Sequence, residues 1–220
     1  MIMQALIQKA RMLAEPRSLS VARRAFHRLT GSTPPEPDVL FGGDESLFKK
    51  LIASATVYGE YGMGKSTRFA IAHTDCKVLA VETSAEYVNS IARELKEDPR
   101  LEARHVDVGP VGKWGRPLTY AKRDNFLTYA SSIWDRDEKP DFVLVDGRFR
   151  VPCFLYSLLH ASSGTRIIFD DYVPRPHYHV VEEVLRPVEF CGRQALFVVP
   201  KSYDKAKAQE LLEQFTLVWD

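Results

Sequence analysis

Residues 56–67, Thr-Val-Tyr-Gly-Glu-Tyr-Gly-Met-Gly-Lys-Ser-Thr, restrict the fold of this chain more than any other stretch. The stretch reads as a short apolar strand that enters a glycine-rich turn and continues as a helix. Glycines at such a turn let backbone N–H groups and a helix N-terminus approach a ligand with no side chain between them. The sequence therefore predicts a strand–turn–helix unit with a ligand at the turn.

The rest of the chain repeats this order of strand and helix. Strands are predicted over 55–60, 77–82, 101–107, 142–146 and 165–170, and helices over 44–52, 65–73, 84–96, 121–134, 151–161, 176–185 and 203–214. Regular alternation predicts a parallel sheet with helices on both faces. The runs 188–191 and 195–199, on either side of Gly192-Arg193, predict an antiparallel hairpin. We expect an α/β, Rossmann-like doubly wound fold, mostly parallel, with a C-terminal antiparallel hairpin.

A loop divides the chain into an extension and a domain. Residues 31–38 contain Gly31 and three prolines, a composition typical of loops. We therefore predict an N-terminal helical extension and loop over residues 1–38, and one domain over 39–220. The extension includes a basic amphipathic segment, Val21 to Leu29, which we expect to cover the domain or to pack in a homodimer. Docking on a membrane surface or an acidic partner is the alternative.

The composition excludes several classes of protein. The net charge of +1 does not favour nucleic acid as a partner, and no apolar run approaches the ~18 residues of a membrane span. The three cysteines are far apart and have no metal-ligand spacing, so we expect free thiols in a reducing compartment. No secretion signal is recognisable at the N-terminus. These features predict a cytoplasmic protein.

Every predicted parallel strand ends at an acidic residue. These residues are Glu60, Glu82, Asp107, Asp146 and the pair Asp170-Asp171. Ligands of open α/β sheets bind beyond the carboxyl ends of the strands. The acids therefore mark the predicted site.

The turn itself fits two patterns. Glu60-x-Gly62-x-Gly64 fits the turn of a nucleoside-binding sheet, and Glu82, 22 residues after Glu60, is placed to accept both hydroxyls of a ribose. Asp107 is then a candidate acceptor for an adenine amino group.

Gly59 to Ser66 also fits a phosphate-binding loop, in which Lys65 and Ser66 hold phosphate and Mg²⁺ with Asp146 or Asp170. This alternative leaves Glu82 without a role and puts Glu60 in a loop meant for polyanionic phosphate. We therefore favour the nucleoside site.

Together with Val81-Glu82, Asp146-Gly147-Arg148 and the final hairpin, residues 60–67 resemble class I S-adenosylmethionine-dependent methyltransferases, over about residues 40–200. The similarity is greatest to small bacterial methyltransferase-like proteins. The resemblance implies that Gly62 and Gly64 hold the methionine part of S-adenosylmethionine and that Glu82 binds its ribose. Neighbouring positions are also expected to bind the cofactor, and the full set is Glu60, Gly62, Gly64, Ser66, Glu82, Thr83 and Asp107.

A finer resemblance links Asp146, Asp170 and Asp171 to the metal-dependent O-methyltransferases of the catechol type. It implies that these three carboxylates bind Mg²⁺, which would orient an acceptor hydroxyl and lower its pKa. The chain departs from that family at Phe149, where the family often has a lysine. The alternative is that Asp146 and Asp171 form salt bridges with Arg148, Arg166 or Arg175.

The predicted function is methyl transfer from S-adenosylmethionine to an oxygen of a small molecule, with metal assistance as one variant. The expected catalytic residues are Asp146, Arg148, which suits an anionic substrate group, and His177, a candidate base near neutral pH. Trp114 is a candidate lid in its glycine-rich loop. The rival functions are a phosphate-loop nucleotide hydrolase or kinase, and a methyltransferase-fold module that binds without turnover.

Overall fold

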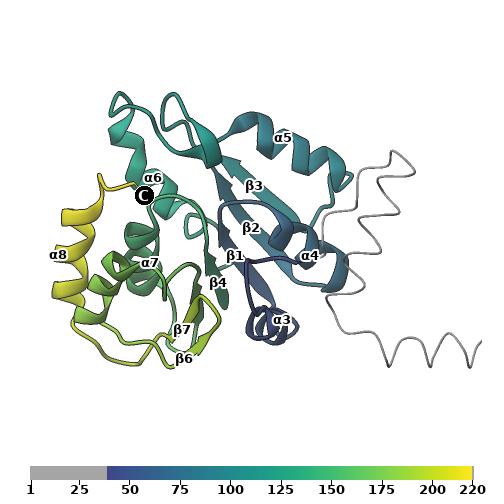
Figure 1. Cartoon of the computed structure of the whole chain (residues 1–220). Coiled ribbons are helices and arrows are strands. Elements are labelled where there is room, and N and C mark those ends of the chain that lie inside the picture. The colour runs from purple at the N-terminus through teal and green to yellow at the C-terminus, as the bar shows by residue number, and fades with distance from the viewer. Residues whose placement is uncertain (1–38, 220) are drawn as a thin grey trace, which may run out of the picture. The chain divides into compact units, whose positions relative to one another are not determined.

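The computed structural model describes residues 39–219 (Figure 1). The predicted extension over residues 1–38 lies outside them, so its helices and its boundary stay predictions. A seven-stranded sheet has the order β3-β2-β1-β4-β5-β7-β6. The pairs among β1 to β5 are parallel, and β7 runs antiparallel to both β5 and β6. The predicted fold class is confirmed.

The elements follow the predicted order. The strands are β1 (Val57–Tyr61), β2 (Lys77–Glu82), β3 (Leu101–His105), β4 (Phe142–Val145), β5 (Arg166–Phe169), β6 (Glu189–Cys191) and β7 (Gln194–Val198). The α-helices are α3 (Ser46–Ile52), α4 (Lys65–His73), α5 (Ala85–Glu94), α6 (Phe126–Ser131), α7 (Arg150–His160) and α8 (Lys205–Phe215). Three 3₁₀ segments are η1 (Lys113–Gly115), η2 (Arg123–Asn125) and η3 (Pro176–Glu183). None of the helices within residues 39–219 is long and apolar enough to cross a membrane.

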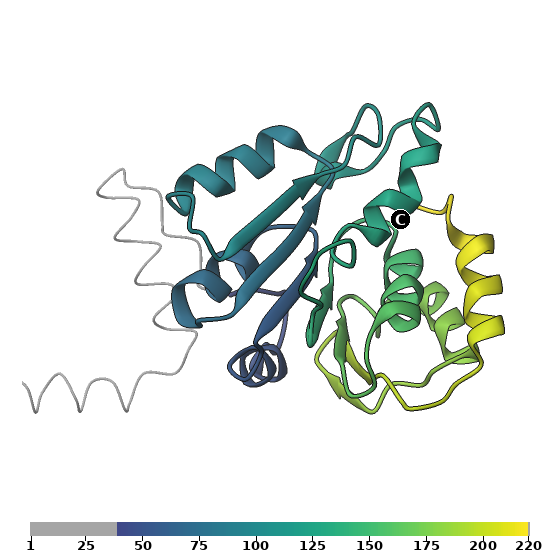
Figure 2. The same cartoon turned by 180° about the vertical axis from the view of Figure 1, so that it is seen from behind.

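Side-chain alternation along the strands builds a core on each face of the sheet. Val143 and Val145 of β4 pack in one core with residues of α6, α7, η3 and α8, whereas Phe142 and Leu144 pack in the other with residues of α3, α4 and α5. Figures 1 and 2 show the two helical layers from opposite sides. Apolar residues at successive positions of β4 therefore mean burial on both faces, as expected for a central parallel strand.

Two predicted helices differ in the structure. The helix expected over 121–134 is a 3₁₀ turn followed by the short α6, because exposed charged residues fill 122–124 and the hydroxyl of Ser132 donates to the carbonyl of Thr128. The segment that begins at Pro176 is a 3₁₀ helix and not an α-helix.

The strand register brings the predicted site residues to one edge of the sheet. Tyr61 pairs with both Val81 and Val145, and Val145 pairs with Phe169. The residues that follow these strands therefore lie next to one another. Phe169 also pairs with Ala195 of the antiparallel β7, so the hairpin turn just before β7 lies at the same edge.

Candidate functional site

Two glycines shape the turn after β1. Gly62 has a positive φ of 87°, and a Cβ at this residue would lie 2.7 Å from the Cα of Gly147. A Cβ on Gly147 would lie 2.3 Å from the Oη of Tyr129 and 2.8 Å from the N of Gly62. Only glycine fits at either position, because the backbones after β1 and β4 are in direct contact. This contact fixes the turn beside Asp146.

Glu60 supports the turn from inside the protein. Its side chain is fully buried, and its carboxylate accepts hydrogen bonds from Tyr58 Oη (2.9 Å), Ser66 Oγ (2.8 Å) and Thr67 Oγ1. Thr67 Oγ1 in turn accepts from the N–H of Gly64 (2.8 Å). Burial raises the pKa of Glu60 to about 7, although the three hydroxyls lower it.

This geometry gives the side chains of Glu60 and Ser66 a structural role. They hydrogen-bond to each other inside the protein, where they hold the turn and the start of α4 in place. They are positioning residues for the turn. Binding of the cofactor by either residue stays a prediction.

Glu82 lies at the ligand side of this turn. The side chain is only partly buried, and its Oε1 accepts from the N–H of Thr83 (2.6 Å), the Oγ1 of Thr83 (3.0 Å) and the N–H of Ser84 (3.3 Å). Its Oε2 accepts from the N–H of Met63 (3.2 Å), and within residues 39–219 no cation pairs with the carboxylate. A carboxylate oxygen has about two acceptor positions, so Oε2 keeps one for a ligand hydroxyl.

The loop after β3 is attached to the end of β2. Thr83 Oγ1 donates to the carbonyl of Gly115 (2.8 Å), which places the neighbouring Trp114 near Glu82. Trp114 is 78% exposed and has a positive φ of 62°, an uncommon conformation for a bulky residue. The buried Thr83 side chain therefore serves to hold this loop. Asp107 is exposed, and it accepts from the N–H of Gly109 (2.9 Å).

The phosphate-loop alternative finds no support in this geometry. Gly59, where that loop would begin, is the third residue of β1 and pairs with Leu79 and Val143. The turn consists only of residues 62–64, which is too short to wrap around a phosphate chain. Ser66 Oγ, which would hold Mg²⁺ there, donates to the buried Glu60.

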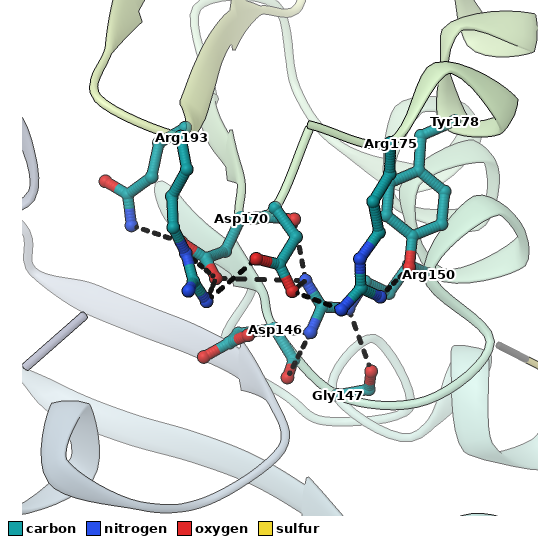
Figure 3. A network of polar contacts seen from close by, with 9 residues as sticks. Asp146, Gly147, Arg150, Asp170, Arg175, Tyr178 and Arg193 are labelled. Carbon is teal, nitrogen blue, oxygen red and sulfur yellow. Dashed lines mark hydrogen bonds and ion pairs between the residues drawn. The ribbon is translucent and has the colours of Figure 1, made fainter. Parts of the chain in front are cut away.

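The acids after β4 and β5 have arginine partners (Figure 3). The buried guanidinium of Arg150 lies 2.9 Å from Asp146 Oδ1, 3.4 Å from Asp171 Oδ2 and 3.8 Å from Asp170 Oδ2. It also donates to the carbonyls of Gly147 (3.1 Å) and Asp170 (2.6 Å). One side chain therefore contacts all three acids that we predicted as metal ligands.

Two further arginines complete this cluster. Arg193 Nε donates to both Asp170 carboxylate oxygens (3.1 and 3.0 Å), and its Nη2 lies 3.0 Å from Asp171 Oδ1. Arg175 Nη2 lies 2.7 Å from Asp171 Oδ2. Burial alone would raise the pKa of Asp170, but hydrogen bonds from Arg193 and Gln194 outweigh it and hold that pKa below its usual range.

The alternative of salt bridges to Asp146 and Asp171 is correct for one of the three arginines that it named, and it omits two others. Asp171 pairs with Arg175 as that alternative proposed, whereas Arg166 pairs with Asp141 at the other end of the strand (3.7 Å). The sequence did not predict Arg150 or Arg193 as partners of these acids. The signal for Arg193 was available, because a hairpin that returns antiparallel to β5 brings the turn at Gly192-Arg193 to the strand end that carries Asp170.

These residues do not fit the predicted Mg²⁺ site. Guanidinium groups already contact the carboxylates that would bind the ion, and three arginines balance the charge of three aspartates. Among the residues that the structure describes, no group of three or more histidine, cysteine or acidic side chains is arranged to hold a metal ion. The finer resemblance to the metal-dependent enzymes therefore does not extend to the metal.

The remaining candidates lie close to this cluster in sequence. Asp146 is partly exposed, and loss of solvent around its carboxyl raises its pKa above the usual range. Arg148 is half-buried on the segment between β4 and α7. His177 is exposed in η3, and its ring lies 4.4 Å from that of Tyr178.

Comparison with known proteins places the chain among methyltransferases. No family model and no curated protein matches it. Among solved structures, it is similar to a methyltransferase-like protein from Silicibacter pomeroyi, with 32% identity and a TM-score of 0.70, over 82% of this chain and 97% of that one.

A second similar structure is the N-methyltransferase NodS from Bradyrhizobium japonicum in complex with S-adenosylhomocysteine. Its identity is 11% and its TM-score 0.51, over 81% of this chain and 98% of that one. It is evidence of a common fold alone. The identity to the Silicibacter protein, over nearly all of its length, shows that this chain belongs to the class I S-adenosylmethionine-dependent methyltransferase family.

Proposed function

We propose that this protein transfers a methyl group from S-adenosylmethionine to an oxygen of a small molecule. The observation that carries the cofactor assignment is Glu82, a partly exposed carboxylate beside the glycine turn with no cation partner in the described part of the chain. Gly62, Gly64 and Glu82 would hold the cofactor, with Asp107 and the loop of Trp114 further along the same edge. Bound S-adenosylmethionine would supply an electrophilic methyl group.

Asp146 is the residue that we assign to the acceptor. Its Oδ1 is held by Arg150, and it directly precedes Gly147, which contacts the cofactor turn. Its raised pKa makes it a better base near neutral pH than an ordinary aspartate. In this proposal Asp146 takes the proton of the acceptor hydroxyl, Arg148 binds an anionic group of the acceptor, and His177 lies at the rim of the site.

The test is a transfer assay with isotopically methyl-labelled S-adenosylmethionine and a panel of small hydroxyl compounds. We expect label in at least one compound with the wild-type protein. With Asp146→Asn, we expect turnover to fall about 100-fold while cofactor affinity stays unchanged, which is the size of a typical general-base contribution. Cofactor binding without label transfer to any compound would favour the non-catalytic module. Transfer only to amines would contradict the assignment of an oxygen acceptor.

A further inference from the structure

We propose that Arg150 is the resident cation of the acceptor site and occupies the place that a divalent metal ion would take among Asp146, Asp170 and Asp171. That this place is an acceptor site rests on the proposed function. The exchange of metal for arginine rests on the contacts of Arg150 alone. It predicts a methyltransferase site that neither binds nor needs a divalent cation.

The position of Arg150 is the first support. Its guanidinium lies within 3.8 Å of a carboxylate oxygen of each aspartate, and its side chain is 4% exposed. It is anchored from behind by the carbonyls of Gly147 and Asp170, at 3.1 and 2.6 Å. A group that contacts three carboxylates and two carbonyls from the centre of the cluster leaves no central position for an ion (Figure 3).

The charge balance is the second support. Arg175 and Arg193 bind the same carboxylates from the more exposed side, so the three aspartates face three guanidinium groups. An added divalent ion would therefore meet a cluster that carries no net negative charge, and it would lie beside the guanidinium groups. Repulsion between like charges opposes such binding, most strongly where water is excluded.

The chemistry of the guanidinium gives the exchange a consequence. Arginine stays protonated at all physiological pH values, and it donates along fixed N–H directions. Arg150 therefore holds Asp146 in one orientation without regard to metal concentration. A bound metal ion can be chelated by two adjacent oxygens of a substrate, which strengthens substrate binding. The guanidinium of Arg150 cannot be chelated in this way. Arg150 acts through Asp146, so it is a positioning residue.

The experiment measures Mn²⁺ binding by electron paramagnetic resonance in the full-length protein saturated with S-adenosylhomocysteine. The variants are Arg150→Met, Arg150→Lys and the control Arg166→Met, which removes an arginine paired with Asp141 at the opposite end of β5. We expect no stoichiometric Mn²⁺ at millimolar concentration with wild type, Arg150→Lys or Arg166→Met. We expect Arg150→Met to gain Mn²⁺ affinity by at least about tenfold, because its carboxylates lose their central cation. Mn²⁺ should then raise the melting temperature of that variant alone.

Two results would overturn the proposal. One is stoichiometric Mn²⁺ on the wild-type protein that disappears in Asp171→Asn. The other is an Arg150→Met variant with a native near-ultraviolet circular dichroism spectrum and no gain in Mn²⁺ affinity. Removal of a buried charge partner is destabilising, and if Arg150→Met fails to fold, the wild-type and Arg150→Lys titrations decide alone. S-adenosylhomocysteine binding is measured separately, so failure of the cofactor assignment stays distinguishable from failure of the metal exchange.

Discussion

The carboxylates along the sheet edge have different partners in its two halves. After β1 and β2, Glu60 and Glu82 accept hydrogen bonds from hydroxyl and backbone N–H groups, and within residues 39–219 neither has a cation partner. After β4 and β5, Asp146, Asp170 and Asp171 are held by guanidinium groups. In the first half Glu82 therefore stays open to a ligand in our proposal, whereas in the second half guanidinium groups orient the acids.

This difference shows that a strand-end acid does not reveal its role by position. Glu60 and Glu82 end neighbouring strands, yet one is fully buried and the other is partly exposed. The groups that reach each carboxylate decide whether it supports the backbone, binds a ligand or balances a charge.

The contact between the two halves is tested by Gly147→Ala. A methyl group would lie within 2.8 Å of atoms of Tyr61, Gly62 and Tyr129, two of them backbone atoms. Such overpacking should lower the free energy of unfolding by about 3 kcal/mol. Chemical denaturation measures it, with Gly64→Ala as the control, because a Cβ there meets only Tyr87 Oη at 3.8 Å. Equal stabilities of the two variants would contradict the close contact of the turns.

The ligand role of the first half is tested by Glu82→Ala. Loss of a carboxylate that accepts from the ligand should weaken S-adenosylhomocysteine binding by at least about 30-fold, or about 2 kcal/mol. Isothermal titration calorimetry measures it. Glu86→Ala, which removes an exposed acid from the first turn of α5, is the matched control and should bind as wild type does. Unchanged affinity in Glu82→Ala would refute the cofactor assignment.

The support role of Glu60 predicts a pH dependence of stability. Its pKa is raised by burial from 4.5 to about 7, so the folded state holds a proton that the unfolded state has released across this range. The contribution of Glu60 to stability is therefore greatest at low pH and is lost as pH rises from about 4.5 to 7, by up to about 1.4 kcal/mol per pH unit.

The check is a series of denaturant titrations from pH 4.5 to pH 8 on wild type and on Glu60→Gln, which cannot ionise. The difference in unfolding free energy between the two proteins should change in favour of the variant as pH rises. A constant difference across the range would mean that Glu60 titrates normally.

The smallest expected effect belongs to Trp114. Because this side chain is 78% exposed, Trp114→Ala should leave the melting temperature unchanged. If the loop covers the bound cofactor, affinity for S-adenosylhomocysteine should fall about fivefold, or about 1 kcal/mol. Phe190→Ala, which removes another exposed aromatic side chain on the edge strand β6, is the control. Equal affinities would remove Trp114 from the site.

Much of the fold was predictable from local pattern. Apolar runs and glycine turns located all seven strands, and the boundaries of α4 and β2 agree with the prediction. The helix predicted over 121–134 is too long. A side-chain hydroxyl that bonds to the helix backbone does not change the apolar periodicity from which the helix was predicted.

The site was only partly predictable. Strand order brought the acids to one edge as expected, but apolar periodicity does not predict which polar groups reach each acid. Arg193 reaches Asp170 from 23 residues further along the chain, across an antiparallel turn, and Tyr58, Ser66 and Thr67 meet Glu60 only in the folded protein. Burial of Glu60 and the arginine cluster therefore depend on tertiary contacts. The homodimer prediction concerns the extension, outside the described residues, and stays a prediction.

The most direct test of the central claim is thermal unfolding with S-adenosylhomocysteine and, separately, with ATP and Mg²⁺. A ligand at about 100 times its dissociation constant adds roughly 2.7 kcal/mol, which is some 5–10 °C for a domain of this size. We predict such an increase with S-adenosylhomocysteine and none with ATP and Mg²⁺. An increase only with ATP and Mg²⁺ would contradict the assignment and support a phosphate-binding loop that contains Lys65.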